Sequence, residues 1–168
     1  MEPKGNLPSQ KKFNILFVCL GNICRSPMAE AVFKHKLSRK NCEGWVADSA
    51  GTAAYHIGNH PDYRTLEVLQ SHGIASTHRA RQVGASDFDS FDLLVAMDKN
   101  NQEDLIRMAG NKSHKVNLLR DFDPLGHGED VPDPYYGGLS EFEAVYEIVD
   151  RSLEVFLDSL SLDQRQTP

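Results

Sequence analysis

The stretch Phe13-Asn-Ile-Leu-Phe-Val-Cys-Leu-Gly-Asn-Ile-Cys-Arg-Ser-Pro27 decides the fold of this chain. Its first part, 13–20, is almost continuously apolar and contains branched and aromatic side chains, which is typical of a strand buried on both faces of a sheet. A short polar loop, 21–25, follows. Ser26-Pro27 then predicts a helix start, because serine can cap a first turn and proline fits the first helical position.

The same alternation of strand and helix continues along the chain. Further strands are predicted at 45–49, 91–97 and 115–120, and helices at 61–72, 100–109 and 139–160. We therefore expect one α/β domain: a doubly wound, four-stranded parallel sheet with helices on both faces. Ligands of such sheets bind at the carboxyl ends of the strands, so the loop after the first strand is the place to look for chemistry. We expect a flexible N-terminal tail over residues 1–12, one domain over 13–160 and a flexible C-terminal tail over 161–168.

Composition and charge exclude several classes of protein. The chain has 168 residues and carries 18 Lys and Arg against 24 Asp and Glu, a net charge of −6, which argues against nucleic-acid binding. No apolar run approaches the roughly 18 residues of a membrane span, and residues 1–12 lack the apolar stretch of a secretory signal. The three cysteines, an odd and sparse set, form no disulfide framework. We expect a soluble protein of a reducing compartment, the cytoplasm, without membrane or nucleic-acid partners.

The loop after the first strand combines a cysteine with an arginine six positions later. Cys19 ends the strand and Arg25 stands at the mouth of the helix. Gly21 and Asn22 can adopt left-handed backbone angles that turn successive N–H groups inward, and the helix dipole adds positive charge. The guanidinium of Arg25 matches two phosphate oxygens. This predicts a phosphate-binding loop, formed with Leu20, Gly21, Asn22, Ile23, Cys24 and Ser26.

Cys19 is the candidate nucleophile of this loop. Helix N-termini and neighbouring cations lower the pKa of a thiol from about 8.5 to between ~3.5 and ~7.5, so a thiolate is expected beneath the bound phosphate. The hydroxyl of Ser26 can donate to that thiolate and later to the departing sulfur. The alternative interpretation is a buried strand cysteine followed by a plain strand-to-helix turn.

Residues 18–27 resemble the phosphate-binding loop of the low-molecular-weight protein tyrosine phosphatases. The resemblance extends over about residues 13–160, because further motifs occur in the order that the family shows. These are Asp48-Ser49, His78-Arg-Ala-Arg-Gln82, Ala96-Met-Asp98 and Asp133-Pro-Tyr-Tyr136. The resemblance implies a two-step hydrolase that needs no metal or cofactor, forms a cysteinyl phosphate and acts on phosphotyrosine proteins and small aryl phosphates. It is expected to be a monomer or a weak homo-oligomer.

The resemblance also implies roles for residues outside the loop. Asp133 corresponds to the general acid and base, although from its neighbours alone it is typical of a turn before proline. Tyr135 and Tyr136 correspond to one wall of the substrate cleft and Tyr55 to the other, where some relatives carry Trp. Ser49 and His78, with Asn22 and Ser26, correspond to a polar network that holds the loop. Asp98 either pairs with an arginine of the loop or caps a helix.

Several alternatives stay open at this stage. Relatives that hydrolyse phosphoarginine carry Thr in place of Ile23, and arsenate reduction needs further cysteines, of which none follows Cys42. A catalytically silent domain that binds phosphotyrosine is a third possibility. Cys24 is either a redox guard that traps oxidised Cys19 as a disulfide, or a space-filling residue. His56 and His60 are four residues apart, but no set of further ligands accompanies them and we expect no metal.

Overall fold

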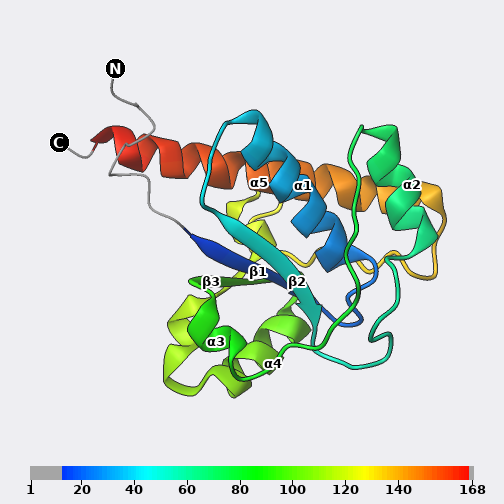
Figure 1. Cartoon of the computed structure of the whole chain (residues 1–168), viewed down its shortest axis with the longest axis horizontal. Helices are drawn as coiled ribbons and strands as arrows, with labels where there is room; N and C mark the ends of the chain where they lie inside the picture. The colour runs from blue at the N-terminus through cyan, green and yellow to red at the C-terminus, as the bar shows by residue number, and fades with distance from the viewer. Residues whose placement is uncertain (1–12, 167–168) are drawn as a thin grey trace.

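Strand β1 (Asn14–Cys19) lies inside the sheet and carries the phosphate loop at its carboxyl end. In the computed structural model, which describes residues 13–166, β1 pairs in parallel with β2 (Val46–Gly51) on one side and β3 (Leu93–Ala96) on the other. β3 pairs in turn with β4 (Val116–Leu118), giving the order β2-β1-β3-β4. Figure 1 labels the first three of these strands. The predicted four-stranded parallel sheet is confirmed. The strand order reverses beside β1, so the loops after β1 and β3 diverge and open a crevice.

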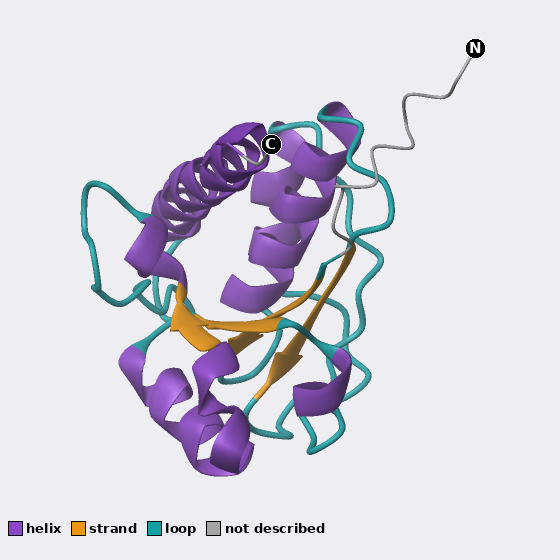
Figure 2. Cartoon of the chain, turned by 90° about the vertical axis from the view of Figure 1, so that its left-hand side faces the viewer, coloured by secondary structure: helices purple, strands orange, loops and turns teal. Residues whose placement is uncertain are grey.

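Helices cover both faces of the sheet because alternate side chains of β1 point into two separate cores (Figure 2). Ile15 and Phe17 face α1 (Arg25–Arg39) and α5 (Leu139–Gln166), and α2 (Tyr63–Ser71) packs against both of these helices. Leu16 and Val18 face α3 (Asp87–Ser90) and α4 (Lys99–Ala109). Two 3-10 helices, η2 (Gly110–Lys115) and η3 (Leu119–Phe122), flank β4. The doubly wound architecture is therefore as predicted.

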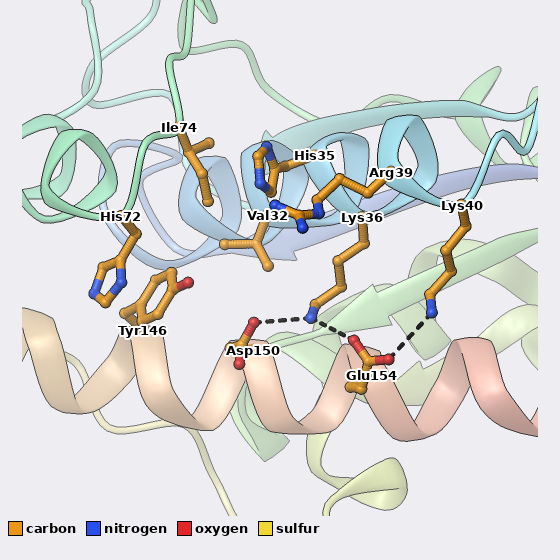
Figure 3. Close-up of a pocket in the computed structure, with 10 residues that line it drawn as sticks. All are labelled: Val32, His35, Lys36, Arg39, Lys40, His72, Ile74, Tyr146, Asp150 and Glu154. Atoms are coloured by element: carbon orange, nitrogen blue, oxygen red, sulfur yellow. Dashed lines mark hydrogen bonds and ion pairs between the residues drawn. The ribbon is translucent and has the colours of Figure 1, made fainter.

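Ion pairs tie the far end of α1 to α5, away from the phosphate loop (Figure 3). The ammonium of Lys36 lies 2.8 Å from Asp150 and 2.7 Å from Glu154, and Lys40 lies 3.2 Å from the second oxygen of Glu154. Since a helix rises by about 1.5 Å per residue, Lys36 lies roughly 16 Å along α1 from Arg25. These cations thus pair with Asp150 and Glu154 of α5, away from the phosphate loop.

Some boundaries differ from the sequence-based expectations. Helix α5 continues to Gln166, so the predicted helix end at about residue 160 was wrong. The predicted N-terminal tail, 1–12, and the last two residues lie outside the described residues. Helix α1 begins at Arg25 with Cys24 at its N-cap and no side-chain cap, so the predicted capping role of Ser26 was also wrong. Among residues 13–166, no helix has the length and apolar character needed to cross a membrane.

Candidate active site

Cys19 lies at the floor of the phosphate loop, where β1 ends. Its side chain is almost fully buried, and its sulfur lies 3.0 Å from the hydroxyl oxygen of Ser26. The backbone N–H of Asn22 donates to the same sulfur at 3.3 Å. Two polar contacts thus hold the Cys19 sulfur at the floor of the loop, where a nucleophile would meet a bound phosphate.

Asn22 holds the loop in its shape from within. Its φ is 60°, in the left-handed region, and among the residues of the loop only Asn22 has a positive φ. The expectation that Gly21 shares this conformation was therefore wrong. The side-chain amide of Asn22 donates to Ser26 at 2.8 Å and Ser49 at 3.0 Å, while its oxygen accepts from the backbone of Arg81 at 2.9 Å. A left-handed residue costs about 1–2 kcal/mol, and these bonds offset that cost.

The polar network continues behind the loop to α1. Ser49 donates to Glu30 at 2.7 Å, and the two ring nitrogens of His78 lie 2.7 Å from the Asn22 side-chain oxygen and 3.1 Å from Glu30. Burial works against the charge of Glu30, but hydrogen bonds from His78, Lys34 and Ser49 outweigh it and lower the pKa of this carboxyl. The structure thus brings Asn22, Ser26, Ser49 and His78 together as expected, and adds a buried carboxylate that their order in the sequence does not show.

Arg25 is buried, belongs to the first turn of α1 and lines the same cavity as Cys19. Its guanidinium donates to Asp98 at 2.7 Å and to the backbone carbonyl of Val131 at 3.0 Å. Burial opposes its charge, but the Cys19 sulfur and the Asp98 carboxylate raise the pKa of Arg25, so it stays a cation. The second oxygen of Asp98 accepts from the N–H of Asn101 at the start of α4. Both predicted roles of Asp98 are therefore present at once.

Asp133 reaches the same cavity from the long loop between η3 and α5. Its carboxylate lies 3.9 Å from the Arg25 guanidinium, and its side chain is 49% exposed. The cavity between the two loops has a volume of about 400 Å³. Cys19 and Arg25, and the distant Asp133, therefore line one cavity.

The loop that carries Asp133 is anchored at its base by a buried carboxylate. Asp123 is fully buried and accepts from Arg151 at 2.8 Å and from Arg120 at 2.9 Å. The hydrogen bonds from Arg151, with a further contribution from Arg120, lower the pKa of Asp123 to about 2 in spite of its burial. Arg120 also donates to the carbonyl of Asp130, so the anchor reaches to within three residues of Asp133.

The comparisons with known proteins agree with this geometry. Residues 14–166 match the family model described as low molecular weight phosphotyrosine protein phosphatase. The human protein of that name is 44% identical over 156 residues, which cover 90% of this chain and 98% of the relative. The chain belongs to this phosphatase family.

Solved structures of phosphatases share the fold of this chain. A protein tyrosine phosphatase from Entamoeba histolytica, crystallised with Hepes in the active site, superposes with a TM-score of 0.86 at 38% identity and covers 91% of this chain and 99% of its own. The Drosophila arginine phosphatase superposes with a TM-score of 0.82 at 37% identity, covering 87% of this chain and 96% of its own. The chain is accordingly a phosphatase, a hydrolase of phosphorylated substrates.

Aromatic side chains form the mouth of the phosphatase cleft. Tyr55 is 73% exposed, Tyr136 is 95% exposed, and Tyr135 packs edge-on against Tyr136 with 5.0 Å between ring centroids. All three line the cavity, as the resemblance implied, together with Leu20 and His56. His56 thus faces the cleft, a position that the sequence did not predict.

Several residues of the phosphatase site were missed by the sequence analysis. Glu30 supports the network, Arg81 pairs with Asp48, and Asp62 and Arg64 join the two loops of the site. Asp48 and Arg81 lie in the motifs of the family resemblance, but the sequence did not show that they pair. Asp62 also left a signal, because an aspartate before a helix predicts an N-cap, and it does cap α2.

One cluster of the phosphatase has the spacing of metal ligands. Among the side chains described, the ligand atoms of Glu30, Asp48 and His78 lie within 4.8 Å of one another. Lys34 and Arg81 each already hold an oxygen of these carboxylates, and His78 lies between them. This cluster is therefore a network of ion pairs that supports Ser49 and Asn22.

Gly51, at the end of β2, lets a strand approach the phosphate loop. A Cβ at this position would lie 2.6 Å from the carbonyl oxygen of Leu20 and 3.2 Å from the backbone nitrogen of Asn22. The absence of a side chain thus allows β2 to pack directly under the loop that holds Cys19.

Proposed function

We propose that the chain hydrolyses phosphotyrosine on proteins, and small aryl phosphates, in two chemical steps. In the first, the Cys19 thiolate attacks phosphorus, the bond from phosphorus to the aryl oxygen breaks, and the acid form of Asp133 gives its proton to that oxygen. Arg25 and the N–H groups of the loop hold the remaining phosphoryl oxygens and stabilise their charge in the transition state. The product of this step is a cysteinyl phosphate.

The second step returns the enzyme to its starting form. The Asp133 carboxylate takes a proton from water, the water oxygen attacks phosphorus and the bond from sulfur to phosphorus breaks. The electron pair returns to Cys19 as the thiolate, with the hydroxyl of Ser26, 3.0 Å away, as its donor. Inorganic phosphate leaves, and Asp133 again carries the proton.

The observation that carries this proposal is that Cys19, Arg25 and Asp133 line one cavity walled by tyrosines. Flat aromatic walls suit an aryl ester, whose ring can stack between them. The test is release of phosphate from a phosphotyrosyl peptide at about pH 5–6, where a thiolate and a protonated acid coexist. We expect turnover that a chelator does not reduce. Binding of the peptide without turnover would show that the chain is a silent binding module.

Phosphoarginine is the second candidate substrate, since an arginine phosphatase shares the fold. Ile23 lines the cavity and offers no hydroxyl to a guanidinium, which favours an aryl ester. Assays of a phosphotyrosyl and a phosphoarginyl peptide of otherwise identical sequence separate the two. We expect the higher kcat/KM for phosphotyrosine, and the reverse order would overturn the choice. Arsenate reduction is disfavoured because the cysteine after the loop, Cys42, lies outside the residues that line this cavity.

We also propose that Cys24 protects Cys19 from irreversible oxidation. Burial raises the pKa of the Cys24 thiol, and the charges of Asp62 and Cys19 add to this, so Cys24 stays protonated while Cys19 reacts. Peroxide would oxidise Cys19 to a sulfenic acid, with which the Cys24 thiol condenses to a disulfide and water. Mass spectrometry after mild peroxide treatment should show the Cys19–Cys24 disulfide. Sulfinic Cys19 with a free Cys24 would contradict the proposal.

The setting we propose for this enzyme is the cytoplasm, where its thiols stay reduced. All three cysteines are free in the structure. We propose an active monomer or a weak homo-oligomer, because one copy of the chain already supplies the nucleophile, the arginine and the acid of the site. Light scattering over a range of protein concentrations, with activity measured in parallel, tests this: activity confined to an oligomer would contradict it.

A further inference from the structure

Arg64 lies between the phosphate loop and the loop that carries Asp133, although it does not line the cavity. It belongs to the first turn of α2, and its side chain is 16% exposed. Its Nε and Nη2 donate to the two carboxylate oxygens of Asp62, each at 2.9 Å, while Nη1 donates to the carbonyl of Gly137 at 2.8 Å. The guanidinium also covers the buried ring of Phe142 at 4.4 Å from its centroid. Three donors and one face of a single side chain are thus engaged.

On one side, this arrangement is fixed to the phosphate loop. The backbone N–H of Asp62 donates to the carbonyl of Ile23 at 2.8 Å, and the hydroxyl of Thr65 lies 3.4 Å from the carbonyls of Ile23 and Cys24. The Asp62 side chain is only 9% exposed, and it also accepts from the backbone N–H of Arg64. The start of α2 is therefore docked on the backbone that surrounds Cys19.

On the other side, Arg64 holds the turn that follows Asp133. The N–H of Gly137 donates to the carbonyl of Pro134 at 2.8 Å and closes this turn, and the N–H of Tyr135 donates to the carboxylate of Asp133 at 3.1 Å. The Tyr135 ring lies 5.7 Å from the Arg64 guanidinium. The hydrogen bond from Arg64 to Gly137 therefore fixes a turn to which the Asp133 carboxylate is also hydrogen-bonded.

We infer that Arg64 is a positioning residue that sets the place of Asp133 relative to Cys19. The inference rests on the proposed role of Asp133 as general acid. A guanidinium suits this task, because its planar fork binds a carboxylate with two donors and still has a donor for a carbonyl, whereas lysine has one point of charge. Arg64 bridges the loops through Asp62 and Gly137 without touching the reacting atoms.

The test is the dependence of kcat/KM on the leaving group. Phenyl phosphate needs a proton from Asp133 to depart, whereas 2,4-dinitrophenyl phosphate does not, because its phenolate is already stable. Displacing the acid should therefore reduce kcat/KM for phenyl phosphate on the order of 10- to 100-fold in Arg64→Gln and less in Arg64→Lys, with little change for the dinitrophenyl ester. Combined with Asp133→Asn, Arg64→Gln should cause no further leaving-group-dependent loss.

Controls separate positioning from a general loss of structure. Arg107→Gln removes an exposed arginine that pairs with Asp104 on α4, and it should leave both substrates unchanged. Inhibition by inorganic phosphate should also be unchanged in Arg64→Gln, because the phosphate loop is intact. If Arg64→Gln does not fold, Arg64→Lys carries the same comparison.

The outcomes that overturn the inference are distinct. An equal loss on both esters, or no loss, would show that Arg64 only stabilises the fold. Asp133→Asn alone should show the leaving-group-dependent loss. If it does not, the acid assignment fails, and the role of Arg64 fails with it for that separate reason.

Discussion

The phosphate loop and the loop that carries Asp133 meet in one cavity but are held in opposite ways. Cys19, Asn22, Arg25 and Ser26 are each at most 4% exposed. The side chains of Ser49 and His78 and the backbone N–H of Arg81 hold Asn22 from behind. Asp133 is 49% exposed and Tyr136 is 95% exposed. The loop that carries Asp133, here called the acid loop, is restrained at its two ends. Asp123 holds its start, and Arg64 holds Gly137, which follows Asp133.

This difference follows from the two tasks. An anion receptor gains when its donors are fixed before the ligand arrives, because no reorganisation is then needed in the transition state. A proton donor must reach a leaving oxygen that differs between substrates, and then must meet water. Burial therefore suits the first loop, and exposure with anchored ends suits the second.

The largest expected effect on turnover comes from replacing the nucleophile of the phosphate loop. Cys19→Ser should lower turnover below detection, because a serine hydroxyl at this position stays protonated. Binding of inorganic phosphate, measured by calorimetry, should persist, since Arg25 and the N–H groups remain. Turnover within ten-fold of the parent would show that Cys19 is not the nucleophile.

The second effect is confined to the acid loop. Asp133→Asn keeps an acceptor for the N–H of Tyr135 but has no proton to give. It should reduce kcat/KM for phenyl phosphate by about 10²–10⁴-fold, the usual contribution of a general acid. Inhibition by phosphate should not change, which sharpens the division between the two loops. Parent-like activity would require another acid.

A third test concerns the base of the acid loop and depends on pH. The pKa of Asp123 is about 2 in the fold, against about 3.9 in an unfolded chain. Its carboxylate thus contributes about 2 kcal/mol of stability above pH 4, and this contribution is lost as the pH falls through 2. Urea unfolding should find Asp123→Asn less stable than the parent at pH 7, with the gap narrowing from pH 4 to pH 2.5. A constant gap would mean that packing, and not the charge of Asp123, anchors the loop.

The smallest expected effect is a change in stability at Asn22 of the phosphate loop. Asn22→Ala and Asn22→Gly both remove the side-chain bonds, but only alanine is strained at a φ of 60°. Alanine should therefore be less stable than glycine by about 1 kcal/mol in urea unfolding. Equal stability of the two variants would mean that the loop relaxes, and that it is less rigid than the contacts of Asn22 indicate.

The same contrast decides how much could be predicted from sequence. The phosphate loop is contiguous, so its strand, its nucleophile and its arginine were evident from residues 13–27. From its neighbours alone, Asp133 has the pattern of a turn, and only the family resemblance suggested an acid. Glu30 bonds to Ser49, 19 residues away, and Arg64 bonds to Gly137, 73 residues away, and no periodicity records such pairs. The order of the strands was likewise hidden, because buried strands share one apolar pattern.

Gly51 has a consequence in genetics. Every missense change in its codon adds at least a Cβ, and that atom would lie 2.6 Å from the carbonyl oxygen of Leu20. A position without any reactive group is therefore sensitive to every inherited substitution. In a saturation library selected for phosphatase activity, codon 51 should return glycine alone, because the constraint on it is one of volume.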